Sequence, residues 1–172
     1  MNEIVKVFDI VPFAKPRMTR RDGWSMAIGR RHKARKCVLD WLCFREEIQW
    51  QAEGDGFEMP ESGYHVIFVM PMPASWSPKK RQEMDGKPHQ QTQDKDNLEK
   101  ALLDALCPGG DAYIWDGRPT KVWGYEGMII IVAIEPPSLE EIKKTIAMAK
   151  EMIPAKKEHN DQRNSQQKDS AV

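Results

Sequence analysis

Residues 93–111 read QDKDNLEKALLDALCPGGD, and this stretch decides how the middle of the chain folds. From about Asn97 to Leu106 its apolar residues recur at the spacing of one helix face, and the Pro-Gly-Gly that follows ends the helix. Two acidic residues, Asp94 and Asp96, come just before that helix. The stretch therefore predicts a helix whose N-terminus carries a pair of carboxylates.

This pair of carboxylates has the chemistry of a metal site. If the approach to the helix is extended, the side chains of Asp94 and Asp96 point to the same side. Their mutual repulsion is offset by a hard divalent cation, and Mg²⁺ is typically held by one or two carboxylates together with substrate phosphate oxygens. Lys100 lies four residues after Asp96, so its ammonium shares that helix face and can stabilise charge developing on a phosphate.

The same residues also allow a purely structural interpretation. Asp96 followed by Glu99 fits a capping box, in which Asp96 only caps the helix and Asp94 is an ordinary loop acid. Asp104, one turn after Lys100, either pairs with that lysine or faces solvent.

A second acidic segment, which begins at Asp111, favours the metal site. We expect Asp111 to open a strand over about residues 112–123, and the tight Pro-Gly-Gly turn lets that strand run back beside Asp94. A third carboxylate there would complete a metal site of the kind used for in-line cleavage of phosphodiesters.

The rest of the chain predicts an α+β fold in which helices cover one mixed β-sheet. Strands are expected near residues 2–11, 64–70, 112–123 and 128–134, the last two as a hairpin, and further helices near 32–53, 77–86 and 138–153. These elements form a single domain over residues 1–153. Residues 154–172 are polar and almost without apolar side chains, so we expect a disordered C-terminal tail.

Charge is distributed unevenly along the chain. The formal net charge is zero, so charge alone predicts no partner. Between Lys15 and Lys36, however, nine Lys or Arg residues accompany a single acid, Asp22. This stretch is either an anion-binding surface or an ordinary solvated loop and helix face. No apolar run is long enough to span a membrane and no signal peptide is recognisable, so we expect a cytoplasmic protein.

The acidic segments resemble the RusA family of Holliday-junction resolvases, in particular its prophage members. The resemblance runs from about residue 4 to about residue 135, and its separated motifs occur in the family's order. They are Asp94-x-Asp96-Asn97-x-x-Lys100 with Asp104, then Asp111-Ala-x-Ile-x-Asp116-x-Arg118-x-x-Lys121, with Pro16-Arg17-Met18-Thr19-Arg20 and Ser75-Trp76-Ser77-Pro78-Lys79-Lys80-Arg81 upstream.

This resemblance implies a homodimeric endodeoxyribonuclease that binds four-way DNA junctions by shape. Such enzymes cut the junction symmetrically with Mg²⁺, or with Mn²⁺ in its place, in recombination and repair. Carried over by position, Asp94, Asp96 and Asp111 resemble the family's metal-binding catalytic carboxylates, and Lys100 resembles its catalytic lysine. The residues expected to bind the DNA backbone are Lys15, Arg17, Arg20, Arg21, Lys79, Lys80 and Arg81.

The sequence departs from the family pattern in two places. Family members often have proline before the first aspartate, where this chain has Gln93. The spacer between Asp104 and Asp111 is also short, which leaves Asp116 as an alternative third ligand. We prefer Asp111 because the Asp-Ala-x-Ile-x-Asp-x-Arg string aligns better from that residue.

Other functions also fit parts of the sequence. A non-catalytic protein that binds branched DNA would use the acids only as caps and ion pairs, and a nuclease of broader branched-DNA specificity would use the same site. An enzyme acting on a small phosphorylated substrate is disfavoured by the basic stretch and by the lack of a Gly-rich phosphate loop. His89, beside the acidic loop, either orients a phosphate or water or is an ordinary loop histidine.

Overall fold

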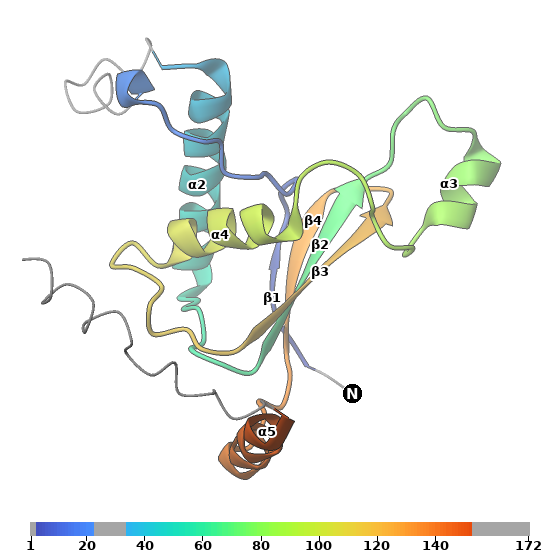
Figure 1. Cartoon of the computed structure of the whole chain (residues 1–172). Helices are drawn as coiled ribbons and strands as arrows, with labels where there is room; N and C mark the ends of the chain where they lie inside the picture. Colours follow the sequence, from blue (N-terminus) through green and yellow to red (C-terminus); the bar gives the residue numbers. More distant parts are fainter. Residues whose placement is uncertain (1–2, 23–33, 153–172) are drawn as a thin grey trace, which may run out of the picture. The chain divides into compact units, whose positions relative to one another are not determined.

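A four-stranded mixed sheet forms the centre of the fold (Figure 1). The computed structural model describes residues 3–22 and 34–152. Its strands are β1 (Ile4–Phe8), β2 (Tyr64–Pro71), β3 (Gly117–Gly124) and β4 (Met128–Ala133), in the order β1-β4-β2-β3. β2 is parallel to β3, whereas β4 is antiparallel to both β1 and β2. The α+β class with a mixed sheet is therefore confirmed.

Helices follow β1, β2 and β4 along the chain, and the helices at residues 36–55 and 95–106 cover one face of the sheet (Figure 1). They are α2 (Lys36–Asp55), α3 (Pro78–Met84), α4 (Lys95–Leu106) and α5 (Leu139–Met152). Parallel neighbours need a long crossover, and the chain between β2 and β3 supplies one that contains α3 and α4. α4 packs against α2 and β3. None of the residues of α3 is buried, and the helix projects away from the sheet.

One hydrophobic core holds the sheet to α2 and α4. Every second residue of β2 is buried, as period-two alternation requires. The core joins these residues to α2, α4 and β4, and its fully buried members include Val38, Ile48, Val66, Phe68, Leu98, Leu102, Ile129 and Ile131. Each such side chain contributes about 1.5–3 kcal/mol. The buried stripe of α4 therefore fixes which of its faces is left for solvent.

Two expectations about the C-terminal strands are wrong. β3 begins at Gly117 and not near residue 112, because residues 107–114 fold into turns: Gly110 N donates to Cys107 O and Ile114 N to Asp111 O. β3 and β4 also do not form a hairpin. The apolar strand β2 lies between them and pairs with both, so the short connection 125–127 passes over the end of β2.

The chain divides into two compact units, Met1–Pro136 and Pro137–Val172. The first contains the sheet and the candidate site. In the second, α5 is amphipathic and has no buried residue. The expected domain boundary at residue 153 and the expected tail lie at and beyond the end of the described residues. Among the helices that the structure describes, none is both long and apolar enough to cross a membrane.

Candidate functional site

The N-terminus of α4 presents the predicted pair of carboxylates. Helix α4 begins at Lys95, so Asp94 is its N-cap residue and Asp96 lies within the first turn. The capping box formed by Asp96 and Glu99 is therefore excluded. The Asp94 side chain makes no capping hydrogen bond, and both aspartates are exposed. Their charge also lies at the positive end of the helix dipole, where it is favoured.

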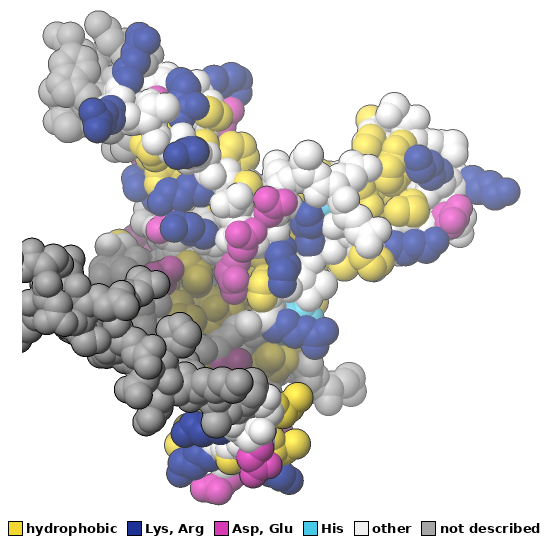
Figure 2. Space-filling view, viewed as in Figure 1, with side chains coloured by type: hydrophobic (Ala, Val, Ile, Leu, Met, Phe, Trp, Pro, Cys, Tyr) yellow, Lys and Arg dark blue, Asp and Glu magenta, His cyan; other side chains and the backbone are white. Residues whose placement is uncertain are grey.

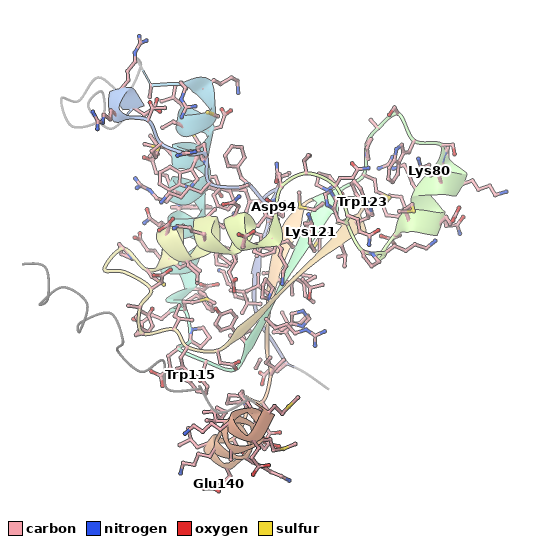
Figure 3. The ribbon with its side chains drawn as sticks, in the orientation of Figure 1. Lys80, Asp94, Trp115, Lys121, Trp123 and Glu140 are labelled. Atoms are coloured by element: carbon pink, nitrogen blue, oxygen red, sulfur yellow. The ribbon has the colours of Figure 1, made fainter. Side chains whose placement is uncertain are left out.

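The loop that leads into Asp94 is held by β3. Lys121 Nζ donates to the carbonyl oxygens of Gln91 at 2.9 Å and Gln93 at 2.6 Å. Figure 3 shows Lys121 beside Asp94 at the start of α4. In the sequence Arg118 and Lys121 are only parts of a motif, because a lysine 28–30 residues away from the carbonyls it binds leaves no local signal.

Lys100 lines an open cavity that carries positive charge. The cavity has a volume of about 520 Å³ and is bounded by Asn97 and Lys100 of α4 and by residues 15–18 of the N-terminal loop. Arg17 is exposed at its edge. Figure 2 shows the acidic side chains gathered over α4 with Lys and Arg side chains on either side. An anionic phosphate in this cavity would lie next to the acidic end of the same helix.

Lys15 attaches this loop to the helix. Its Nζ lies 2.6 Å from Asp104 Oδ2 and 5.1 Å from the centre of the Trp41 ring, and its backbone N–H donates to Asn97 O at 3.5 Å. Asp104 therefore pairs with Lys15 and not with Lys100. The prediction that Lys15 contacts DNA stays a prediction, but the structure gives its ammonium a partner within the protein.

Asp22, the one acid of the basic stretch, joins residues 17–22 to Arg35 at the start of α2. Its buried carboxylate accepts hydrogen bonds from Thr19 and from the Arg35 guanidinium, and these bonds hold its pKa well below the usual range. Arg35 Nη2 also donates to Arg17 O at 2.6 Å. This network fixes the backbone at Arg17, while Arg20 and Arg21 are exposed one helical turn further on. Residues 23–33 lie outside the described residues.

The structure does not bring Asp111 to the acidic end of α4. Asp111 lies in the turn that follows the helix, and Figure 3 shows Trp115 of the same segment well away from Asp94. Asp111 and Asp116 line a cavity of about 390 Å³ together with Glu99. Asp116 Oδ2 accepts from Gly63 N at 3.2 Å, and a Cβ on the following Gly117 would collide with the Tyr64 ring, so this corner is closely packed.

Glu99 and Tyr64 form a polar contact that the sequence analysis missed. Tyr64 and the half-buried Glu99 line the same cavity, and their side chains interact there. Burial raises the pKa of Glu99, and the nearby charge of Asp96 adds to the effect. Tyr64 falls on the apolar face of a strand, so its sequence position indicates only a core residue.

The donor set at the start of α4 fits a hard divalent cation. Asp94 and Asp96 supply carboxylate oxygens that are open to solvent, and Mg²⁺ commonly needs no more protein ligands than two when substrate phosphates supply the rest. Over residues 3–22 and 34–152 no group of three or more His, Cys, Asp or Glu side chains is placed to hold a metal. Within this described part of the chain, the start of α4 therefore offers a pair of ligands and not a closed cage.

Helix α3 presents a second basic surface. Lys79 and Lys80 are exposed, and Lys80 Nζ lies 4.1 Å above the centre of the Trp76 ring. The Arg81 guanidinium lies 5.2 Å from the Tyr125 ring centre. Cation–π contacts of this kind hold long basic side chains in place without neutralising their charge.

The His89 ring packs against Trp123, next to the tryptophan that precedes α3. Its ring is 7% exposed and lies 4.0 Å from the Trp123 ring, which in turn contacts Trp76. Burial and the neighbouring Lys121 charge lower the pKa of His89. The structural interpretation of this histidine is therefore the one that the geometry supports.

Comparison with known proteins gives one match. The model of a protein family described as Endodeoxyribonuclease RusA matches residues 8–135. No curated protein and no solved structure gives a significant match. The matched segment contains both strand partners of β2, helices α2 to α4 and the acidic end of α4.

Proposed function

The chain belongs to the RusA endodeoxyribonuclease family, and from this membership we propose that it resolves four-way DNA junctions by paired, symmetric cuts. As a family member it is an endodeoxyribonuclease, an enzyme that hydrolyses phosphodiester bonds within DNA. One observation carries the assignment of its site. Two exposed carboxylates, Asp94 and Asp96, stand at the start of a rigid helix whose next turn presents Lys100 to a basic cavity.

Asp94 and Asp96 are the residues proposed to hold a divalent cation, which we take to be Mg²⁺ with Mn²⁺ as a substitute. Such an ion, when bound, supplies Lewis-acid stabilisation of charge on phosphate oxygens. Both carboxylates are anchored by α4, whose opposite face is buried in the core. The site thus holds its ligands on a rigid element and leaves the remaining positions to the substrate.

Lys100 is the residue proposed to act on the phosphate itself. It lies one helical turn after Asp96, and Asp104, the acid one turn further on, is paired with Lys15. A fixed ammonium beside the reacting phosphate favours the transition state, in which negative charge accumulates. Asn97, on the same cavity wall, can donate a hydrogen bond that orients the phosphate.

Asp111 keeps a secondary place in this proposal. It shares its cavity with Asp116 and Glu99, apart from the pair at Asp94 and Asp96. The geometry supports a site in which two carboxylates are essential and Asp111 contributes less. Asp116, the alternative third ligand, has its carboxylate hydrogen-bonded to Gly63.

Two basic surfaces are proposed to bind the DNA backbone. The first contains Arg17, Arg20 and Arg21, and the second contains Lys79, Lys80 and Arg81 of the α3 region. They lie on separate projections of the first unit (Figure 1), which suits a branched substrate better than a single duplex face. Contacts of this kind make binding strongly dependent on salt.

A homodimer is the assembly proposed to act on this substrate. A four-way junction has approximate two-fold symmetry, and a two-fold dimer would place one acidic site on each of two symmetric strands. Paired nicks would then follow from the symmetry of the complex. The second acidic site would come from a second copy of this chain.

The experiment uses an end-labelled synthetic four-way junction, with linear duplex, a three-way junction and a flap as parallel substrates. Each is incubated with the full chain in Mg²⁺, Mn²⁺, Ca²⁺ or EDTA. We expect paired symmetric nicks in the junction with Mg²⁺ or Mn²⁺ and none in EDTA. Equal cutting of every branched substrate would instead indicate a broader branched-DNA nuclease, and tight binding without any cutting would indicate a non-catalytic binding protein.

A further inference from the structure

The backbone immediately before Asp94 has an unusual conformation. Among the residues that the structure describes, Gln93 is the only one other than glycine with a positive φ, which is 78°. L-residues other than glycine rarely adopt this backbone conformation, because their Cβ comes too close to the carbonyl oxygen. Conformations of this kind persist only where the surroundings impose them. The structure must therefore contain a group that holds Gln93 in this state.

That group is the ammonium of Lys121. It donates to Gln91 O at 2.9 Å and to Gln93 O at 2.6 Å, so it holds two carbonyls that flank a single turn. The Gln93 carbonyl thus accepts a hydrogen bond from a charged ammonium, and charge-assisted hydrogen bonds are strong. Both glutamine side chains are exposed and add no other constraint from the core.

Lys121 is itself fixed on both sides. It lies within β3, opposite Phe68 of the central strand β2. Its own carbonyl accepts from His89 N at 2.9 Å, so the chain on the far side of β3 is bound to it as well. A charged side chain on a paired strand can hold a loop at a defined position, and Figure 3 shows Lys121 near Asp94.

We propose that Lys121 is a positioning residue, which orients the Asp94 carboxylate by holding the Gln91 and Gln93 carbonyls of the loop that leads into Asp94. The proposal rests on the role of Asp94 in the proposed function. Gln93 is covalently joined to Asp94, so rotation about the Gln93 backbone would swing the Asp94 side chain away from Asp96. Lys121 acts through the backbone and does not touch the substrate.

The main competing role for Lys121 is direct contact with a DNA phosphate. The two roles differ in what they predict for binding. A phosphate contact that is lost weakens binding and reduces the slope of log K against log salt by about one. A positioning residue that is lost leaves the junction Kd and its salt slope unchanged and lowers only the rate of cleavage.

The test begins with Lys121→Met, compared with Lys143→Met on the exposed surface of α5 as a matched control. We expect the single-turnover cleavage rate to fall by about 10²-fold, as for a misplaced reacting group. The junction Kd should stay within about two-fold of the wild type, with the same salt slope. A lower slope together with weaker binding would overturn the proposal in favour of a phosphate contact.

Substitutions at Gln93 and Asp94 test whether Lys121 acts through the Asp94 carboxylate. Gln93→Gly removes the steric penalty of a positive φ and should leave the rate near that of the wild type. The double variant Lys121→Met with Asp94→Asn should be no slower than Asp94→Asn alone, because Lys121 acts through that carboxylate. Multiplicative losses would show two independent effects and overturn the proposal.

A readout that does not need activity separates this proposal from the proposed function. Hydrogen exchange of the backbone amides at residues 90–95 should become faster in Lys121→Met, with α2 unchanged. If exchange changes as expected but the wild type cuts no junction, Lys121 does hold the loop before Asp94, and the nuclease assignment of the site fails. If the wild type cuts, Asp94→Asn does not, and Lys121→Met cuts normally, the positioning role fails alone.

Discussion

Lys15 Nζ and Asp104 Oδ2 lie 2.6 Å apart, and this ion pair joins the basic N-terminal loop to helix α4. Both side chains are about three-quarters covered, and Trp41 lies under the ammonium at 5.1 Å. The pair thereby fixes the distance between Arg17 on the loop and Lys100 on the helix. The basic cavity exists because this contact closes one side of it.

Loss of this ion pair should therefore lower the stability of the fold more than it lowers the rate of cleavage. We expect Lys15→Met to lower the free energy of unfolding by about 1 kcal/mol, from the partly covered ion pair and the cation–π contact. Asp104→Asn should cost a similar amount, and the two losses should not add. Urea denaturation of the two single variants and the double variant measures this coupling. Full additivity would show that the contact contributes nothing.

Arg17 should behave as a DNA contact. Its backbone is fixed by Arg35 while its side chain is exposed at the edge of the cavity. Arg17→Ala is expected to weaken junction binding and to reduce the magnitude of the salt slope by about one. Fluorescence anisotropy over a salt series measures both quantities. Lys36→Ala is a suitable control because Lys36 already pairs with Asp40, and an equal loss there would contradict a specific role for Arg17.

Lys100 should contribute to the rate and not to binding. Its ammonium faces the cavity without an acidic partner in the described part of the chain. Lys100→Met is expected to lower the single-turnover rate by about 10²–10³-fold, the effect of removing one fixed group that stabilises transition-state charge. The junction Kd should change by less than about three-fold, since many other phosphate contacts remain. A variant that binds ten times more weakly at an unchanged rate would refute this role.

Two partly buried histidines should make stability depend on pH. Burial lowers the pKa of His65 and of His89 below the ordinary value. Near pH 6.5 and below, the unfolded chain therefore binds protons that the folded chain does not. The free energy of unfolding is highest above pH 6.5 and falls as the pH drops below that value. His89→Phe keeps a ring against Trp123 and should flatten the loss between about pH 7 and pH 5. Thermal unfolding at each pH tests this, and identical pH profiles would exclude His89 as the cause.

The helices and the central strand were predictable because their signals are local. The periodic apolar residues of α4 and the alternating residues of β2 determine which faces are buried. Strand order was not predictable in this way. The position of β2 between β3 and β4 depends on contacts between residues far apart in sequence, and turn residues such as Gly124 and Gly127 suit a hairpin equally well.

The site divides along the same line. Asp94, Asp96 and Lys100 share one helix, so their spacing alone predicts that they lie together. Asp111 was placed with them on the assumption of a strand, and the turns at residues 107–114 keep it apart. Lys121 and the contact between Tyr64 and Glu99 depend on how β2, β3 and α4 assemble, for which the sequence carries no local pattern.

The central claim is that the carboxylates of Asp94 and Asp96 carry metal-dependent junction cleavage. The most direct measurement is single-turnover cleavage of the four-way junction by wild type, Asp94→Asn, Asp96→Asn and Asp111→Asn across a Mg²⁺ titration. We expect the first two variants to lose at least about 10²-fold in rate with binding intact, and Asp111→Asn to lose much less. Wild-type rates in Asp94→Asn and Asp96→Asn, or cleavage that persists in EDTA, would contradict the account.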